Sequence, residues 1–351
     1  MTTTILLTGA SGFLGGHILA ALSRRDLVRV VAASRSADRL PASFTGETHI
    51  GDLTDPQYVA DAVRGIDVVI HAGTWSSFWG HAREEQRLFL APSIALIDAA
   101  VAAGVARFVS ASTVAISTPA GSGEVVADDA AAVKRGYWPH LDAMIDVESH
   151  MRDAAGATQM TSLQLGHFVG EGCSMSLVSA IVPRLKTRQV PWVDHGRAHL
   201  PLVSGEDMGE AFALAALADG LAPFESINIA GAEQPTAREV FTFVAETAGV
   251  PKPAYSVPLG AAHGFGSLME SVHPVTPGKA PFLTRALVHV GENWNVSTHL
   301  ASTKLGFEAR TDWRDAARDS IEERRAGGFA WPALAQAATC SVPAGSPMRV
   351  R

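Results

Sequence analysis

The sequence predicts an α/β fold in which a doubly wound parallel sheet is followed by a smaller, less regular C-terminal region. In the first half of the chain, short apolar runs alternate with longer helical patterns. This alternation is typical of parallel strands joined by right-handed helical crossovers, and strands buried on both faces have nearly continuous apolar runs. The 351 residues are 47% apolar and 18% charged, which excludes a disordered chain and permits a large core.

The first half contains the expected elements of the sheet in a regular order. The pattern predicts a helix from Gly12 to about Arg24, and a long Ala/Leu/Ile pattern predicts another from about Arg83 to Ala103. We expect strands at or near residues 5–7, 28–33, 49–51, 68–70, 107–110 and 161–165.

The second half is less regular. Helical patterns cover residues 205–218 and 236–248, the second with Thr236 as its N-cap, and residues 227–229 are typical of a short strand. Proline and glycine crowd residues 251–281, which indicates loops and short elements.

Charge and cysteine content exclude several functions. The 35 acidic and 28 basic residues give a net charge of −7, and no Lys/Arg-rich run occurs, so we expect no nucleic-acid partner. Cys173 and Cys340 are far apart and lack metal-ligand spacing, so we expect no metal site and a reducing, cytoplasmic setting. The N-terminal apolar run is too short for a signal peptide, and no stretch approaches the ~20 apolar residues of a membrane span. The oligomeric state stays open.

A glycine-rich loop follows the first strand and opens the first helix. In this loop, Gly9 permits a tight turn, Gly12 lets backbone N–H groups approach a pyrophosphate, and Gly15 lets the helix pack closely on the strand. The phosphates would then lie at the N-terminus of the helix. The spacing is Gly-x-x-Gly-x-x-Gly rather than the commonest Gly-x-Gly-x-x-Gly. We therefore expect a Rossmann-type dinucleotide-binding domain.

Five further segments occur with this loop in a specific order. They are Gly-Asp-Leu-Thr-Asp at residues 51–55, Asp-Val-Val-Ile-His-Ala-Gly at 67–73, the glycines of 166–172, Pro-Leu-Val-Ser-Gly-Glu-Asp-Met-Gly-Glu-Ala at 201–211 and Leu-Gly-Phe at 305–307. Over about residues 3–325 the chain resembles the extended short-chain dehydrogenase/reductase family, especially its 3β-hydroxysteroid dehydrogenase and dihydroflavonol reductase branch.

The resemblance implies a division of the chain. We expect an NADP-binding core over residues 1–170 and a mixed substrate-binding region over 171–330, with some chain crossing back to the core. Residues 331–351 are rich in Ala, Pro and Ser, and we expect a flexible tail there.

The choice of cofactor depends on the end of the second strand. An NAD enzyme usually places an acid there to bind the ribose 2′-hydroxyl, whereas here Ser34 precedes Arg35 and Arg39 is close. A guanidinium suits a 2′-phosphate through charge-assisted hydrogen bonds, so we expect NADP(H). The expected cofactor contacts are Gly9, Ser11, Gly12, Phe13, Leu14, Gly15, Ser34, Arg35, Asp52, Leu53, Ala72, Gly73, Thr74, Ser110, Gly166 and His167.

The chemistry of the family requires a Tyr-x-x-x-Lys pair, and this chain has none. Alignment on Glu148 places His140 in the tyrosine position and Met144 in the lysine position of the family pattern. The family's asparagine falls at Phe89, and only the serine position, Ser112, keeps its residue type. Ser112 and His140 are therefore the candidate catalytic residues.

General acid catalysis contributes roughly 10²–10⁴-fold to a rate, so the missing pair needs a substitute. His140 could donate the proton, a water held by Ser112 could donate it, or the substrate could supply it from a phenol beside the ketone. Pro92 lies within the long predicted helix, where we expect it to kink the helix and to free the carbonyl of Leu88.

Aromatic residues follow the fourth strand, where the pocket of such a domain should open. Rings at these positions suggest a flat aromatic substrate that stacks between them. The expected substrate contacts are Trp75, Phe78, Trp79, Phe89, Met144 and Trp192.

An extended reductase with an altered tetrad and an NADPH site resembles the ketoreductases that tailor angucyclinone aromatic polyketides in antibiotic biosynthesis. The favoured interpretation is therefore an NADPH-dependent ketoreductase whose proton comes from a substrate phenol or from water. Two alternatives stay open: a non-catalytic NADP(H)-binding sensor or scaffold, and a redox-neutral lyase or isomerase on the same fold.

Overall fold

The computed structural model describes residues 2–174, 176–273, 281–329 and 335–337. Its centre is a seven-stranded sheet in the order β11-β7-β6-β4-β1-β2-β3, in which every neighbouring pair is parallel. The predicted Rossmann-type fold is confirmed. The strands of the sheet are β1 (Thr3–Thr8), β2 (Val28–Ser34), β3 (Glu47–Ile50), β4 (Val68–His71), β6 (Arg107–Thr113), β7 (Gln159–Leu165) and β11 (Phe224–Ile229).

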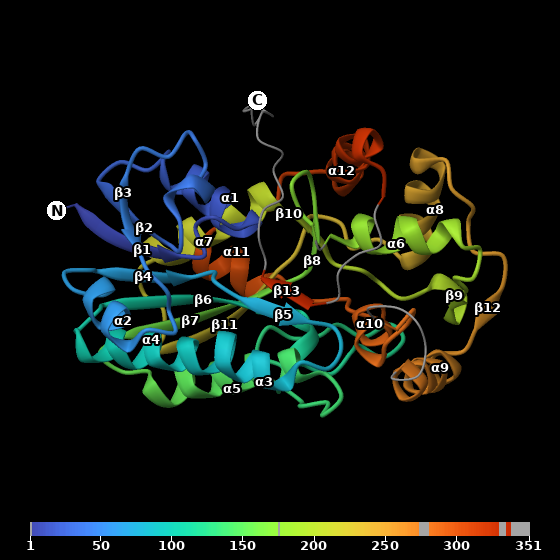
Figure 1. Cartoon of the computed structure of the whole chain (residues 1–351), viewed down its shortest axis with the longest axis horizontal. Helices are drawn as coiled ribbons and strands as arrows, with labels where there is room; N and C mark the ends of the chain where they lie inside the picture. The colour runs from blue at the N-terminus through green and yellow to red at the C-terminus, as the bar shows by residue number, and fades with distance from the viewer. Residues whose placement is uncertain (1, 175, 274–280, 330–334, 338–351) are drawn as a thin grey trace.

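Helices cover both faces of this sheet, as Figure 1 shows. Successive side chains of a strand point to opposite faces, so Ile5 and Leu7 of β1 enter one core while Leu6 enters the other. The first core is covered by α1 (Phe13–Leu22), α7 (Gly205–Leu217) and α11 (His299–Leu305), and the second by α2 (Pro56–Ala62), α4 (Ala91–Ala102) and α5 (Pro139–Ala154).

The second half of the chain crosses back to this core at two places. Strand β11 extends the sheet beside β7, and α7 packs along α1. Glycines allow the close approach of the two helices: a Cβ on Gly205 would lie 2.2 Å from Nε2 of His17, and one on Gly209 would lie 2.5 Å from the carbonyl oxygen of His17.

The rest of the second half forms a smaller region around the parallel pair β8 and β10. Thr236 caps α8 as predicted, because its hydroxyl accepts from the N–H of Glu239 and the Glu239 carboxylate accepts from the N–H of Thr236. The elements of this region are β8 (His167–Val169), α6 (Leu177–Lys186), β9 (Trp192–Val193), η4 (Asp194–Gly196), β10 (Leu202–Ser204), α8 (Ala237–Ala248), β12 (Ser256–Val257), α9 (Leu259–Val272), α10 (Arg285–Val290) and α12 (Trp313–Gly327).

Pro92 changes the long helix that the sequence predicts over residues 83–103. The structure divides it into α3 (Ala82–Glu85), a π-helical turn η2 (Gln86–Leu90) and α4. A backbone hydrogen bond that spans five residues closes the π turn, and the proline follows within the first turn of α4. The helix is widened here rather than interrupted, and π turns of this kind are frequent at functional sites.

Three residues of the C-terminal segment 331–351 pair with the N-terminal half. Ala335–Ala337 form β13, which is antiparallel to β5 (Trp75–Ser77) with Gln336 opposite Ser76. We expected a flexible tail over residues 331–351, and apart from these three residues that segment lies outside the described part of the chain. The remaining short elements are η1 (Ala37–Arg39) and η3 (Val114–Ile116).

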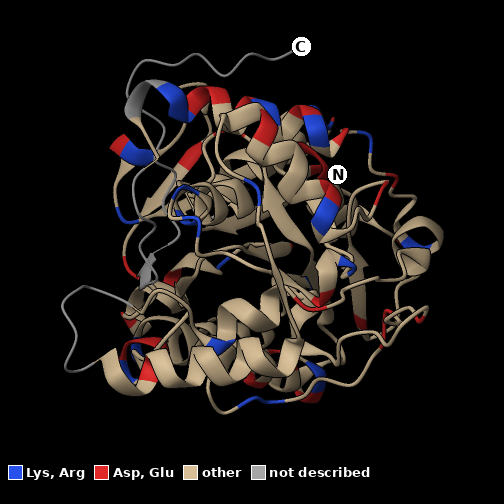
Figure 2. Ribbon diagram, turned by 90° about the vertical axis from the view of Figure 1, so that its right-hand side faces the viewer, with Lys and Arg blue, Asp and Glu red and all other residues tan. Residues whose placement is uncertain are grey.

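Charged residues of both signs are interspersed along the outer helices and loops (Figure 2). Among the helices that the structure describes, none has the length and apolar character needed to cross a membrane.

Candidate active site

The loop between β1 and α1 forms a cradle of backbone atoms with no room for side chains. Gly9 has a φ of +72°, and a Cβ on it would lie 2.5 Å from the backbone nitrogen of Gly73. A Cβ on Gly15 would lie 2.1 Å from the carbonyl oxygen of Gly9. Gly12 is the N-cap of α1 and supplies no capping side chain, so the first N–H groups of the helix can bind an anion. The cradle fits a cofactor diphosphate.

Other expected cofactor residues border this cradle. The side chains of Phe13 and Leu14 are buried in the core beneath α1, so they offer a cofactor only their backbone N–H groups. Ala72 follows β4 and donates its N–H to the carbonyl of Thr8 (3.2 Å). This bond holds the segment 72–74 against the glycine loop.

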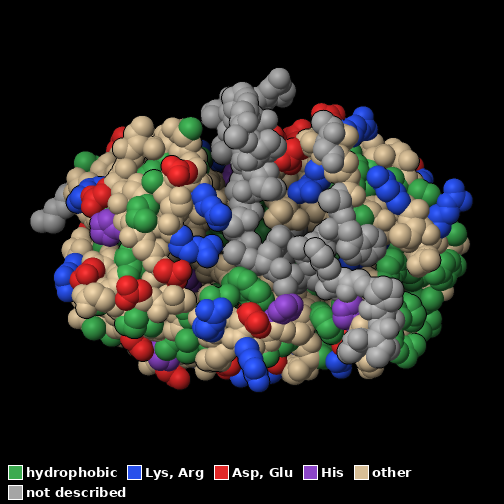
Figure 3. Space-filling model, viewed as in Figure 1, with side chains coloured by type: hydrophobic (Ala, Val, Ile, Leu, Met, Phe, Trp, Pro, Cys, Tyr) green, Lys and Arg blue, Asp and Glu red, His purple; other side chains and the backbone are tan. Residues whose placement is uncertain are grey.

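The carboxyl ends of β2 and β3 form the adjoining part of the site. Ser34 is buried and donates its hydroxyl to a backbone carbonyl two residues further on (2.9 Å), whereas the Arg35 side chain is exposed. The N–H of Thr54 lowers the pKa of Asp52, and the charges of Arg35 and Arg87 lower it further. Arg87, on the π turn, is therefore a second cation near this carboxylate, and the sequence analysis missed it. Basic side chains gather near the middle of the face in Figure 3.

A buried chain of hydrogen bonds links the glycine loop to α4 through His71, the last residue of β4. The Ser93 hydroxyl donates to the carbonyl of Phe89 (2.7 Å), so it accepts from Nε2 of His71 (2.9 Å). Nδ1 of His71 then accepts from the Thr8 hydroxyl (2.7 Å). Burial lowers the pKa of His71 to about 4, so this ring is neutral at pH 7. It joins the two parts of the site through hydrogen bonds and transfers no proton.

The structure brings together the residues at the four tetrad positions, three of which are altered. Phe89, Ser112 and Met144 line one narrow internal gap, and the ring of His140 lies 5.2 Å from that of Phe89. Ser110, an expected cofactor contact, also lines the gap. The hydroxyl of Ser112 is buried and has no hydrogen-bond partner among the described residues. A buried hydroxyl without a partner is a candidate contact for a ligand or a water.

His140 has a buried carboxylate partner that the sequence analysis missed. Its Nδ1 lies 3.0 Å from Oε2 of Glu85, and the Ser77 hydroxyl donates to Oε1 of the same carboxylate (2.8 Å). All three side chains are buried. Nothing local in the sequence marks this contact, because Glu85 and His140 are 55 positions apart.

Several of the expected substrate rings lie near this cluster. Phe78 stacks on Trp138 at 5.5 Å, and the indole N–H of Trp138 donates to the carbonyl of Ser77 (2.7 Å). Trp75 and Trp79 are half-buried in the same segment. These contacts place an aromatic wall beside the Glu85–His140 pair.

Trp192 differs from the other expected substrate residues. It is 8% exposed, its ring stacks on Phe241 of α8 at 6.2 Å, and the guanidinium of Arg238 lies 4.4 Å above it. Trp192 therefore packs within the C-terminal region, and its role as a substrate contact stays a prediction.

Two expected cofactor residues after β7 have different surroundings. A Cβ on Gly166 would lie 2.0 Å from the carbonyl oxygen of Pro201, so close backbone packing requires this glycine. Burial lowers the pKa of His167 to about 4, although a bond with the backbone of Val290 acts in the opposite direction. Nε2 of His167 is buried without a partner among the described residues, which leaves it available to a ligand.

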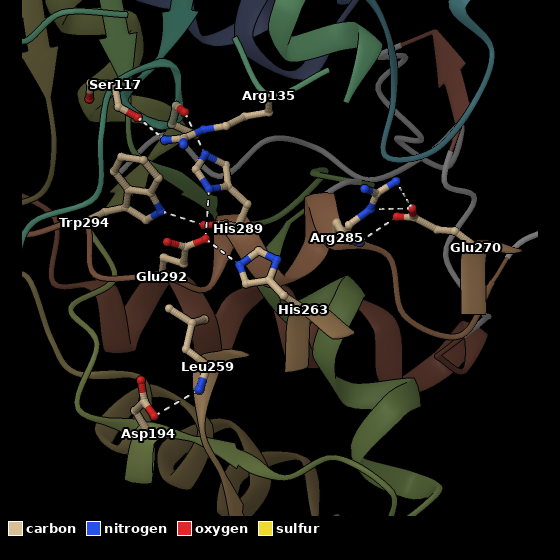
Figure 4. Close-up of polar contacts among 11 residues, drawn as sticks. Ser117, Arg135, Asp194, Leu259, His263, Glu270, Arg285, His289, Glu292 and Trp294 are labelled. Atoms are coloured by element: carbon tan, nitrogen blue, oxygen red, sulfur yellow. Dashed lines mark hydrogen bonds and ion pairs between the residues drawn. The ribbon is translucent and has the colours of Figure 1, made fainter. Parts of the chain in front are cut away.

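A polar cluster attaches α9 and α10 to the loop after β6 (Figure 4). Oε1 of Glu292 lies 3.0 Å from Nδ1 of His289 and 2.9 Å from Nε2 of His263. Nε2 of His289 donates to the carbonyl of Ala115 (3.0 Å). Burial raises the pKa of Glu292, but its bonds with the two histidines outweigh burial and hold that pKa below its usual value. The cluster fixes the C-terminal region beside the start of α5.

The chain belongs to the NAD dependent epimerase/dehydratase family, whose model matches residues 5–230. It is 24% identical over 317 residues to the 4-hydroxy-2-methyl-3-oxo-4-farnesyl-3,4-dihydroquinoline-1-oxide ketoreductase of Stigmatella aurantiaca, covering 87% of this chain and 91% of that one. It is 26% identical over 293 residues to the 2-alkyl-3-oxoalkanoate reductase of Stenotrophomonas maltophilia (strain K279a), covering 81% and 87%.

Solved structures show the same fold. MoeE5 in complex with UDP-glucuronic acid and NAD superposes with a TM-score of 0.68 at 21% identity, covering 92% of this chain and 99% of that one. A short-chain dehydrogenase/reductase superfamily protein from Agrobacterium tumefaciens with bound NAD gives a TM-score of 0.69 at 20% identity, covering 92% and 98%.

Proposed function

We propose that this protein is an NADPH-dependent ketoreductase that acts on a ketone of a polycyclic aromatic compound of the angucyclinone polyketide type. Its family and two relatives named as reductases support an oxidoreductase-type function. One of these relatives is named for a ring ketone on a dihydroquinoline, and the half-buried rings of Trp75, Phe78 and Trp79 suit a flat ring of this kind.

The NAD in neighbouring structures supports a nicotinamide cofactor, which supplies the hydride when it is bound. The backbone of residues 9–15 would hold its diphosphate at the N-terminus of α1. The guanidinium groups of Arg35 and Arg87, both near Asp52, favour a 2′-phosphate and therefore NADPH.

The observation that supports reduction most directly is the unpartnered Ser112 hydroxyl in the gap with Phe89 and Met144. A hydroxyl can hold a ketone oxygen, a water or a substrate phenol in place. Since the chain has no Tyr-x-x-x-Lys pair, the new alkoxide receives its proton from a substrate phenol or from water.

The test uses an angucyclinone-type ketone with a phenol beside the carbonyl, and its methyl ether as the matched control. We expect the protein to consume NADPH with the free phenol, as measured by loss of NADPH absorbance. The methyl ether should bind with similar affinity but should be reduced far more slowly, because its donor is blocked.

Two other outcomes would contradict the proposal. Tight NADPH binding without turnover over a panel of aromatic ketones would indicate a sensor or scaffold. Product formation without net consumption of NADPH would indicate a lyase or isomerase.

A further inference from the structure

The Glu85 carboxylate is an unusual group for its position. Glu85 is 1% exposed, and a carboxylate is seldom buried to this extent unless it is paired. Its ion-pair partner in the structure is His140, with Nδ1 3.0 Å from Oε2. The Ser77 hydroxyl donates to the other oxygen (2.8 Å).

These contacts determine where His140 carries its protons. An ionised carboxylate only accepts hydrogen bonds, so Nδ1 must carry the proton that it donates to Glu85. Nε2, on the other side of the ring, then faces away from this carboxylate.

The position of the pair connects it to the rest of the site. His140 and Met144 are four residues apart on α5 and therefore lie on the same face of that helix. Met144 lines the gap that holds the unpartnered hydroxyl of Ser112, and the His140 ring packs against Phe89 of the same gap. The His140 ring therefore lies beside this gap, with Phe89 between them as a shared neighbour.

We propose that Glu85 is a positioning residue that makes His140 the proton reservoir of the site. The proposal depends on the proposed ketone reduction. The carbonyl carbon gains a hydride from NADPH, and its oxygen takes a proton from the substrate phenol or a water. That phenolate or hydroxide then takes the Nε2 proton of the His140 imidazolium. The neutral ring keeps the proton on Nδ1, which donates a hydrogen bond to Glu85. Solvent returns one proton to Nε2 before the next turnover.

A substitution that removes only the charge tests this role. Glu85→Gln keeps the size and hydrogen-bonding capacity of the side chain but no longer stabilises the imidazolium. We expect kcat to fall about tenfold or more, while KM and the Kd for NADPH change little. The solvent deuterium isotope effect on kcat should rise, because return of the proton becomes the slow step.

The neighbouring carboxylate offers a matched control. Glu84 precedes Glu85 on the same helix, is 45% exposed and lies 3.8 Å from His81. Glu84→Gln should leave kcat and the isotope effect at wild-type values, and Glu85→Asp, which retains the charge, should recover part of the lost rate. A Glu85→Gln protein with wild-type kcat and isotope effect would overturn the proposal.

A second measurement does not depend on the substrate. Nitrogen NMR of protein labelled with ¹⁵N-histidine reports which ring nitrogen is protonated, and His140→Gln identifies the signal of His140. We expect a protonated Nδ1 in the wild type and a shift towards the Nε2–H tautomer in Glu85→Leu. A wild-type His140 protonated only at Nε2 would refute the inference even if ketones are reduced. The expected tautomer without any ketone reduction would instead contradict the proposed function.

Discussion

At the scale of single residues, two arginines lie near the Asp52 carboxylate, where we propose that the adenosine end of the cofactor binds. Arg35 follows β2, and Arg87 reaches the same carboxylate, Asp52, from the π turn. Both side chains are exposed, and an exposed ion pair with a carboxylate contributes little to stability. A dianionic 2′-phosphate would give them a stronger partner through charge-assisted bonds.

Arg35→Ala and Arg87→Ala should each weaken NADPH binding about tenfold, which corresponds to one charge-assisted hydrogen bond of ~1.5 kcal/mol. NADH has no 2′-phosphate, so its Kd should change little. Fluorescence titration with both cofactors measures the difference. Arg64→Ala is the control, because Arg64 pairs with Asp61 at the far end of α2. Equal losses for NADPH and NADH would contradict the assignment of these arginines.

At the scale of elements, the first turn of α1 depends on one close contact. A Cβ on Gly15 would overlap the carbonyl oxygen of Gly9 at 2.1 Å, whereas the atom nearest to a Cβ on Gly16 is the Cγ of Pro41 at 3.9 Å. Two adjacent glycines in one helix therefore have different physical roles. The first is required by packing between helix and loop, and the second has room for a methyl group.

Gly15→Ala should lower the free energy of unfolding by about 1–3 kcal/mol through overpacking, and the displaced loop should bind NADPH more weakly. Gly16→Ala should raise the free energy of unfolding by up to ~1 kcal/mol, because alanine favours the helix. Urea denaturation and cofactor titration of both variants check this contrast. A Gly15→Ala protein as stable as Gly16→Ala would show that the loop relaxes freely.

At the scale of the whole molecule, three histidines with lowered pKa values lie where separate layers meet. His17 packs between α1 and α7, His71 ends β4 beside the glycine loop, and His167 begins β8. Burial lowers the pKa of each to about 4. The native state therefore binds these protons only in acid, whereas the unfolded chain binds them near the unperturbed pKa of about 6.5.

The sign of the effect follows from this difference in proton uptake. The unfolded state binds more protons between pH ~6.5 and about 4, so stability is complete above pH ~6.5 and falls as the pH falls. Each histidine contributes a slope of about 1.4 kcal/mol per pH unit, or about 4 kcal/mol per unit for the three together. Urea denaturation at several pH values measures the slope. His71→Gln should reduce this slope, whereas His81→Gln, a control at an exposed position, should not. A stability that stays constant from pH ~6.5 to 5 would contradict this prediction.

The sequence by itself determined the parallel sheet, the glycine loop and the loss of the Tyr-x-x-x-Lys pair. Each depends on residues that are close in sequence: an apolar run, three glycines within seven positions, or a spacing of four. In the structure Phe89, Ser112 and Met144 line one gap and His140 packs on Phe89, because η2, β6 and α5 lie side by side in the fold, while the catalytic roles of these residues stay predictions.

Only the tertiary structure decided what these residues contact. The pairing of Glu85 with His140 joins positions 55 apart, and the charge of Arg87 acts on a carboxylate from another element. Trp192 has an aromatic side chain suited to a substrate, and only the structure showed that its ring packs against Phe241 of α8. Local patterns record which face of a helix or strand is buried, whereas partners in a site are set by how separate elements meet in space.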